Sequence, residues 1–140
     1  MNSSKVIVTV YSHPEFYPPT LNMIAELSKR FDKVYVLSRN VFVSDWVYPE
    51  NVRLFVTGNL MTIRESESKS QIKKLISFLT YTWGLLKLLL MVKPILLVLC
   101  DPIPTFSFSL IRIFVSSKTR LWYHNHDVTD LKQCRKFSIG

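Results

Sequence analysis

Apolar runs alternate with amphipathic stretches along most of this chain. Short runs rich in Val, Ile and Leu have the length and composition of strands, and they occupy residues 6–11, 34–37, 52–56, 95–100 and 121–123. Apolar residues recur at helical spacing over residues 21–31, 72–92 and 104–114. The predicted order, β-α-β-β-α-β-α-β, is typical of α/β proteins. We therefore expect a Rossmann-like three-layer sandwich with a mostly parallel sheet.

Local signals predict where several of these elements begin and end. Thr20 is a plausible N-cap for the first helix. The turn-forming residues 57–59 close the third strand, and Pro94 stops the long second helix. The continuous apolar run at 95–100 is expected of a central strand covered on both faces.

The long helix at residues 72–92 has three possible explanations. Six large apolar residues mark one of its faces: Ile72, Leu75, Leu79, Trp83, Leu86 and Leu90. A membrane span needs about 20 apolar residues, and Lys87 interrupts the run, so a buried crossover helix is favoured. In an intermediate interpretation, one face packs on the sheet and four lysines meet anionic lipid, namely Lys73, Lys74, Lys87 and Lys93.

Composition and charge limit the classes of function. The 140 residues are 48% hydrophobic, which suits one domain with a real core. Trp46, Tyr48, Trp83 and Trp122 are predicted to lie in that core or between helices. The formal charge of +8 is compatible with nucleic acid, an anionic membrane or phosphorylated substrates. Because the cations are spread along the chain and no recognised motif appears, nucleic acid is the weakest of these partners.

Glycine and cysteine usage excludes other classes. The glycines are Gly58, Gly84 and Gly140, so no Gly-rich loop follows the first strand. Neither a dinucleotide fingerprint nor a P-loop is present. The two cysteines, Cys100 and Cys134, are too few for a disulfide scaffold and favour a reducing compartment. Cys100 is expected to be a buried small hydrophobe. We expect a cytoplasmic protein, because the start of the chain lacks the apolar stretch of a secretory signal.

Polar side chains follow several of the predicted strands. Since the carboxyl ends of parallel strands meet at one edge of a sheet, we expect these side chains to form a site there. The candidates are His13, Asp101, His124, Asn125, His126 and Asp127. His124 and His126 would share one face of a strand and could ligate zinc, but no third ligand is suitably spaced, so no metal is expected.

The chain resembles the N-terminal, acceptor-side domain of a GT-B glycosyltransferase of the family-4-like group. The resemblance covers nearly the whole chain. It is carried by residues 5–10, the helix 21–31, residues 33–37 and 95–102, and the His126-Asp127 step after strand 121–123. It implies transfer of a sugar from a nucleotide sugar to a lipid-linked or polysaccharide acceptor held by this domain, without a metal or other cofactor.

The resemblance also implies roles for the candidate residues. His126 matches the family's histidine near the transferred sugar, and Asp127 would orient a histidine or bind an acceptor hydroxyl. Asp127 is equally suited to capping a helix that begins near residue 129. The other four candidates (His13, Asp101, His124 and Asn125) are expected to bind the acceptor. For Asp101 a turn or cap role is the alternative, and for His13 an exposed loop position.

The resemblance further implies that residues 1–140 are one part of a longer enzyme. The donor-binding domain of such an enzyme is not in this sequence, so the chain alone is expected to be inactive. A peripheral position at the inner face of the cell membrane is compatible with the lysines of the long helix. The alternative is a non-catalytic α/β binding module, or a half-enzyme that needs a separate donor-domain chain.

Overall fold

The computed structural model describes residues 3–11, 14–41, 46–61, 70–115 and 118–124. The elements in chain order are β1 (Lys5–Thr9), η1 (Pro14–Phe16), α1 (Pro18–Arg30), β2 (Lys33–Val41), β3 (Val52–Met61), α3 (Gln71–Val92), β4 (Leu96–Cys100), α4 (Pro102–Ile111), η2 (Arg112–Phe114) and β5 (Arg120–His124). This order confirms the predicted alternation of strands and helices.

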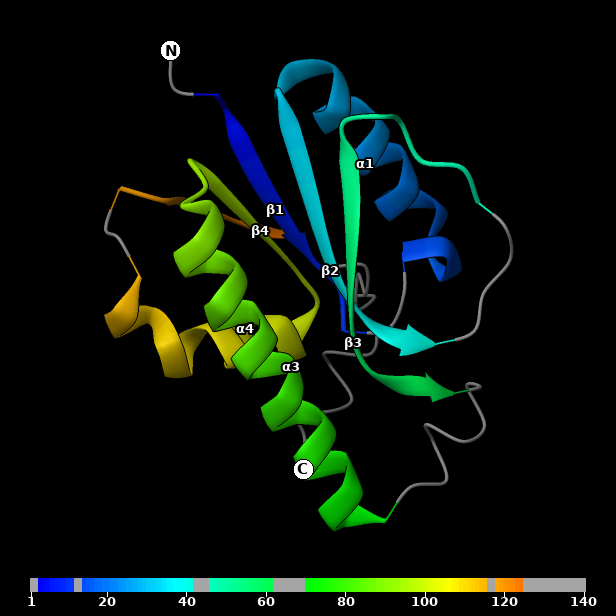
Figure 1. Ribbon diagram of the computed structural model, residues 1–140, viewed down its shortest axis with the longest axis vertical. Coiled ribbons are helices and arrows are strands. Elements are labelled where there is room, and N and C mark those ends of the chain that lie inside the picture. Colours follow the sequence, from blue (N-terminus) through cyan, green and yellow to red (C-terminus); the bar gives the residue numbers. More distant parts are fainter. Residues whose placement is uncertain (1–2, 12–13, 42–45, 62–69, 116–117, 125–140) are drawn as a thin grey trace, which may run out of the picture.

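The five strands form one parallel sheet in the order β3-β2-β1-β4-β5. From β1 the chain moves outward through β2 to β3, and α3 then carries it back across the sheet to β4 (Figure 1). The direction of travel therefore reverses between β1 and β4, which pair from Val6–Leu96 to Thr9–Leu99. The structure confirms the expected Rossmann-like α/β sandwich.

Two hydrophobic layers cover the opposite faces of the sheet. On one face, Met23, Ile24 and Leu27 of α1 pack on alternate strand residues such as Val8. On the other face, α3 and α4 share a layer that contains the intervening strand residues, such as Ile7. The hydroxyl groups of Thr82 and Ser107 hydrogen bond at 3.1 Å and join α3 to α4 inside this second layer.

Helix α3 is much longer than β1 and β4, the strands on either side of the reversal. Its 22 residues span about 33 Å, whereas the five residues of β1 or β4 span about 17 Å. The C-terminal half of α3 lies on the sheet, and the N-terminal half extends past the ends of the strands (Figure 1). By length and composition α3 is apolar enough to cross a membrane. It connects β3 to β4 and packs on the sheet, so it is the crossover helix that the sequence favoured.

Two of the predicted element boundaries are wrong. Helix α1 begins at Pro18, with Tyr17 as its N-cap, and Thr20 is buried in the first turn. Proline at the first helical positions has the required φ and lacks an N–H that would have no partner there. Strand β3 does not end at residues 57–59 but continues to Met61, and Gly58 adopts φ 80° within it.

The prediction that the tryptophans are core or helix-packing residues is wrong for two of them. Trp46 is 53% exposed and Trp83 is 63% exposed. Trp122 is 43% exposed and lies beside α1. Tyr48, in contrast, is half-buried and packs against the α1 layer. The residue type alone therefore did not indicate burial for these tryptophans.

The two sides of α3 are expected to differ in their contribution to stability. Leu85 has no exposed surface, whereas Leu79 is 53% exposed. We expect Leu85→Ala to lower the free energy of unfolding by about 3 kcal/mol, because it leaves a cavity between α3 and the sheet. The matched change Leu79→Ala should cost less than about 0.5 kcal/mol.

Urea unfolding followed by circular dichroism measures both values. Equal losses for the two variants would contradict the orientation of α3 on the sheet.

Candidate functional site

Two of the predicted site residues, Asp101 and His124, lie at the carboxyl edge of the sheet. Asp101 follows β4, and His124 is the last residue of the neighbouring β5. The backbone N–H of Asp101 donates a hydrogen bond to the carbonyl oxygen of His124 at 3.1 Å. The parallel topology thus brings these two positions together, as the order of strands predicted.

The other four predicted site residues are His13, Asn125, His126 and Asp127, and they lie outside the described residues. Their roles remain predictions from the sequence. His126 follows the end of β5 by two residues.

Asp101 has a backbone conformation that L-amino acids rarely adopt. Its φ is 72° and its ψ is 166°, a region used almost entirely by glycine. It occupies the N-cap position of α4, but its carboxylate makes no capping hydrogen bond. Thr105 Oγ1 instead donates to its backbone carbonyl at 3.0 Å. Such a conformation costs on the order of 1–3 kcal/mol and is often found at ligand-binding sites.

The side chain of His124 lies on the α1 side of the sheet. Its ring meets the Trp122 ring edge-on, with centroids 6.0 Å apart. Both rings line a groove of about 420 Å³, together with α1 residues that include Asn22, Glu26 and Arg30. This groove has charges of both signs on its walls, in contrast to a second groove on the opposite side of the sheet.

The second groove, which we call the α3–α4 groove, lies at the carboxyl edge beside the point where the strand order reverses. It has a volume of about 680 Å³. In open α/β folds, ligands bind in this position. Its lining residues come from the ends of β1 and β2 and from the first turns of α3 and α4: Tyr11, Arg39, Lys74, Leu75, Phe78, Pro102, Ile103 and Phe106.

The charge on the wall of the α3–α4 groove is positive. Arg39 Nε donates to the carbonyl oxygen of Tyr11 at 2.5 Å, and the guanidinium group lies 4.0 Å from the centre of the Tyr11 ring. Burial raises the pKa of the Tyr11 phenol, although the nearby Arg39 charge opposes this effect. Tyr11 therefore stays neutral at pH 7. Lys74 adds a second cation, and none of the described residues that line this groove is acidic.

Aromatic side chains form the apolar part of the groove. The rings of Phe78 on α3 and Phe106 on α4 stack with centroids 5.7 Å apart and planes 27° apart. Leu75 and Ile103 extend the same apolar wall. A slot with aromatic walls and two cations suits an amphiphile, that is, a hydrocarbon chain attached to an anionic group.

The residues that build this groove were largely missed by the sequence analysis. Lys74 was singled out only as a lysine that meets lipid, and Arg39, Phe78 and Phe106 were not singled out at all. The apolar spacing places the two phenylalanines on helices. Their stacking, however, depends on the packing of α3 against α4, which no local pattern specifies.

Cys100 ends β4 next to Asp101 and is completely buried, as the sequence predicted. Burial, with a smaller contribution from the Asp101 charge, raises the pKa of its thiol to about 12. Because the thiolate is the nucleophile, this cysteine is unreactive at neutral pH. Among the described residues, no three His, Cys, Asp or Glu side chains gather as metal ligands. The expectation of a metal-free site stays a prediction.

Comparison of this chain with protein-family models, with curated proteins and with solved structures found no match.

The thiol chemistry at the end of β4 can be measured. In a Cys134→Ser variant, Cys100 is the remaining thiol. We expect it to react with iodoacetamide at pH 8 at least about a hundredfold more slowly in the folded protein than in urea, because the raised pKa lowers the thiolate fraction and burial blocks access of the reagent. Mass spectrometry over time gives both rates. Similar rates would show that Cys100 is accessible and its pKa ordinary.

Proposed function

We propose that this chain is the acceptor-side domain of a GT-B glycosyltransferase, and that its acceptor is a sugar linked to a lipid through phosphate. The observation that carries the proposal is the α3–α4 groove, at the reversal of strand order in a Rossmann-like sheet. The sequence resemblance supplies the reaction: transfer of a sugar from a nucleotide sugar that a second domain would bind. The proposed location is the cytoplasm, at the inner face of the cell membrane.

The character of the groove favours a lipid-linked acceptor over a plain polysaccharide. Sugar rings are recognised through many hydrogen-bonding groups, but the described walls of this groove are mostly apolar. Phe78 and Phe106 would hold the hydrocarbon chain, and Lys74 and Arg39 would hold the phosphate. The acceptor hydroxyl would then lie at the carboxyl edge, towards the ends of β4 and β5.

The proposed chemical roles belong to residues that follow β5. His126 would hydrogen bond a sugar hydroxyl or stabilise charge that develops during transfer, and Asp127 would orient a histidine or bind the acceptor hydroxyl. Asp101, His124, His13 and Asn125 are proposed to contact the acceptor. The strained backbone of Asp101 supports a binding role at that position.

The alternative function is a non-catalytic binding module, or a half-enzyme that needs a separate donor-domain chain. The same groove would serve such a module, so binding of a lipid phosphate is common to both functions. Only transfer of a sugar distinguishes them.

Acceptor binding can be tested on the 140-residue chain with farnesyl phosphate, kept below its critical micelle concentration. We expect Lys74→Gln to weaken binding about tenfold, because a charge-assisted hydrogen bond to phosphate is lost. The adjacent change Lys73→Gln removes the same charge outside the groove and should have little effect. Isothermal titration calorimetry gives both dissociation constants. If farnesol bound as tightly as farnesyl phosphate, the proposed phosphate contacts would be wrong.

Transfer is tested by incubating the enzyme that contains this domain with labelled nucleotide sugars and a sugar linked to polyprenyl phosphate, whose free hydroxyl accepts the transferred sugar. We expect His126→Ala to lower turnover at least about a hundredfold, while the affinity for farnesyl phosphate stays within about twofold. Activity that survived within a few-fold would remove His126 from the site. Binding without any transfer would favour the non-catalytic module.

A further inference from the structure

Helix α3 is apolar on two opposite sides. Its inner side packs on the sheet through residues that include Leu85 and Leu89. Its outer side carries a second apolar stripe in which each residue is at least 52% exposed: Ile72, Ile76, Leu79, Trp83 and Leu90. These residues are separated by four, three, four and seven positions, so they lie on one side of the helix. Four residues of the stripe recognised in the sequence, Ile72, Leu79, Trp83 and Leu90, therefore face away from the sheet, whereas Leu86 packs partly against the core.

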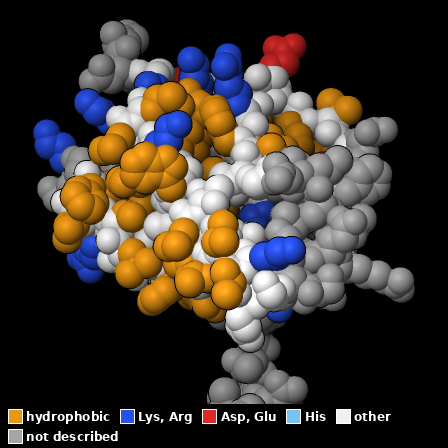
Figure 2. Space-filling model, turned by 60° about the horizontal axis from the view of Figure 1, so that its bottom comes forward, with side chains coloured by type: hydrophobic (Ala, Val, Ile, Leu, Met, Phe, Trp, Pro, Cys, Tyr) orange, Lys and Arg blue, Asp and Glu red, His pale blue; other side chains and the backbone are white. Residues whose placement is uncertain are grey.

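Helix α4 and η2 carry a matching stripe. Ile103, Phe106, Leu110 and Ile113 recur at steps of three and four, and their exposed fractions range from 42% to 81%. Because α3 and α4 cover the same face of the sheet, the two outer stripes form one surface, which we call the α3–α4 face. Figure 2 shows hydrophobic side chains gathered on this side of the molecule, with Lys and Arg around them.

An exposed apolar surface of this extent is unusual in a soluble monomer and marks an interaction site. The stripes are continuous with the α3–α4 groove, since Ile103 and Phe106 belong to both. A partner that covers the α3–α4 face would therefore also lie at the mouth of the α3–α4 groove.

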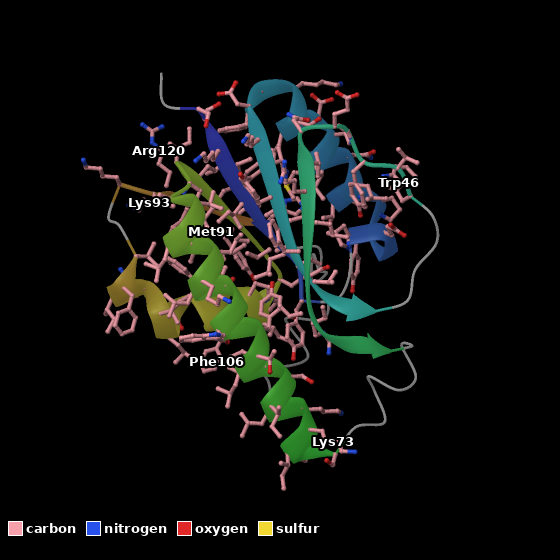
Figure 3. All side chains as sticks on the ribbon, in the orientation of Figure 1. Trp46, Lys73, Met91, Lys93, Phe106 and Arg120 are labelled. Carbon is pink, nitrogen blue, oxygen red and sulfur yellow. The ribbon has the colours of Figure 1, made fainter. Side chains whose placement is uncertain are left out.

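The charges around the α3–α4 face indicate which partner it fits. Helices α3, α4 and η2 contain four basic residues, Lys73, Lys74, Lys87 and Arg112, and no acidic residue. Lys73 and Lys93 lie at opposite ends of α3 (Figure 3). A second copy of the chain would bring the same positive charges together, which disfavours self-association. A bilayer with anionic headgroups satisfies the apolar stripes and the cations at once.

We propose that the α3–α4 face binds the surface of an anionic membrane. The outer stripes of α3 and α4 enter the boundary between headgroups and acyl chains, and Lys73 and Lys87 contact the headgroups. The α3–α4 groove then opens at the bilayer, where an amphiphile can enter it without crossing water. Membrane binding does not depend on glycosyl transfer, so either proposal can fail while the other holds.

The test is flotation of the 140-residue chain with vesicles of phosphatidylcholine alone or with phosphatidylglycerol added. We expect at least tenfold tighter binding to the anionic vesicles. Trp83→Glu should weaken that binding at least tenfold. The matched control is Trp46→Glu, which changes a similarly exposed tryptophan that lies far from α3 in Figure 3. Thermal unfolding of each variant confirms that the fold is kept.

A second pair of variants tests the electrostatic contribution to membrane binding. Lys73→Gln with Lys87→Gln should reduce binding to anionic vesicles about tenfold, whereas Lys33→Gln with Arg53→Gln, which removes the same charge elsewhere, should not. Three results would overturn the proposal: no binding to either vesicle, equal losses for Trp83→Glu and Trp46→Glu, or a stable dimer in size-exclusion chromatography that Trp83→Glu dissociates. The last result would assign the face to a second copy of the chain.

Discussion

The structure depends on the burial of both faces of a short parallel sheet. Parallel strands need cover on each side, and here the two layers are unequal. Helix α1 packs on one face, while α3 and α4 pack on the other. Leu85, Leu88 and Leu89 hold α3 in the layer that also contains α4 and residues of β1, β2 and β4. One wall of the α3–α4 groove depends on that placement, since α3 supplies Lys74, Leu75 and Phe78.

The same constraint explains why α3 has two apolar sides. The buried residues of α3 begin at Tyr81, so only its C-terminal half is held by the sheet. Gly84 lies where the helix passes closest to β3, because a Cβ atom there would come within 2.9 Å of Thr57. The overhanging half keeps a helical apolar pattern that the described part of the chain does not bury. That pattern needs another environment, and the cations beside it favour lipid.

The sequence was sufficient to predict the fold but not the groove. Strand and helix positions follow from local periodicity, and the parallel order follows from the alternation of the elements. Asp101 and His124 were predicted at one edge, and the structure brings them together through a backbone hydrogen bond. Periodicity cannot state which of two apolar sides of a helix is buried, and so the exposure of Trp83 was missed. The contact between Phe78 and Phe106 links residues from two helices and depends on their packing.

The strained backbone of Asp101 lies at the turn between β4 and α4. A glycine in its place would adopt φ 72° without cost, yet the chain has an aspartate there, directly before Pro102. The conformation turns the chain from the buried end of β4 into the first turn of α4, whose Pro102 and Ile103 line the groove. The backbone N–H of Asp101 also ties this turn to the end of β5. The unfavourable backbone therefore sets two features at once: the start of α4, with its residues in the groove wall, and the pairing of the ends of β4 and β5.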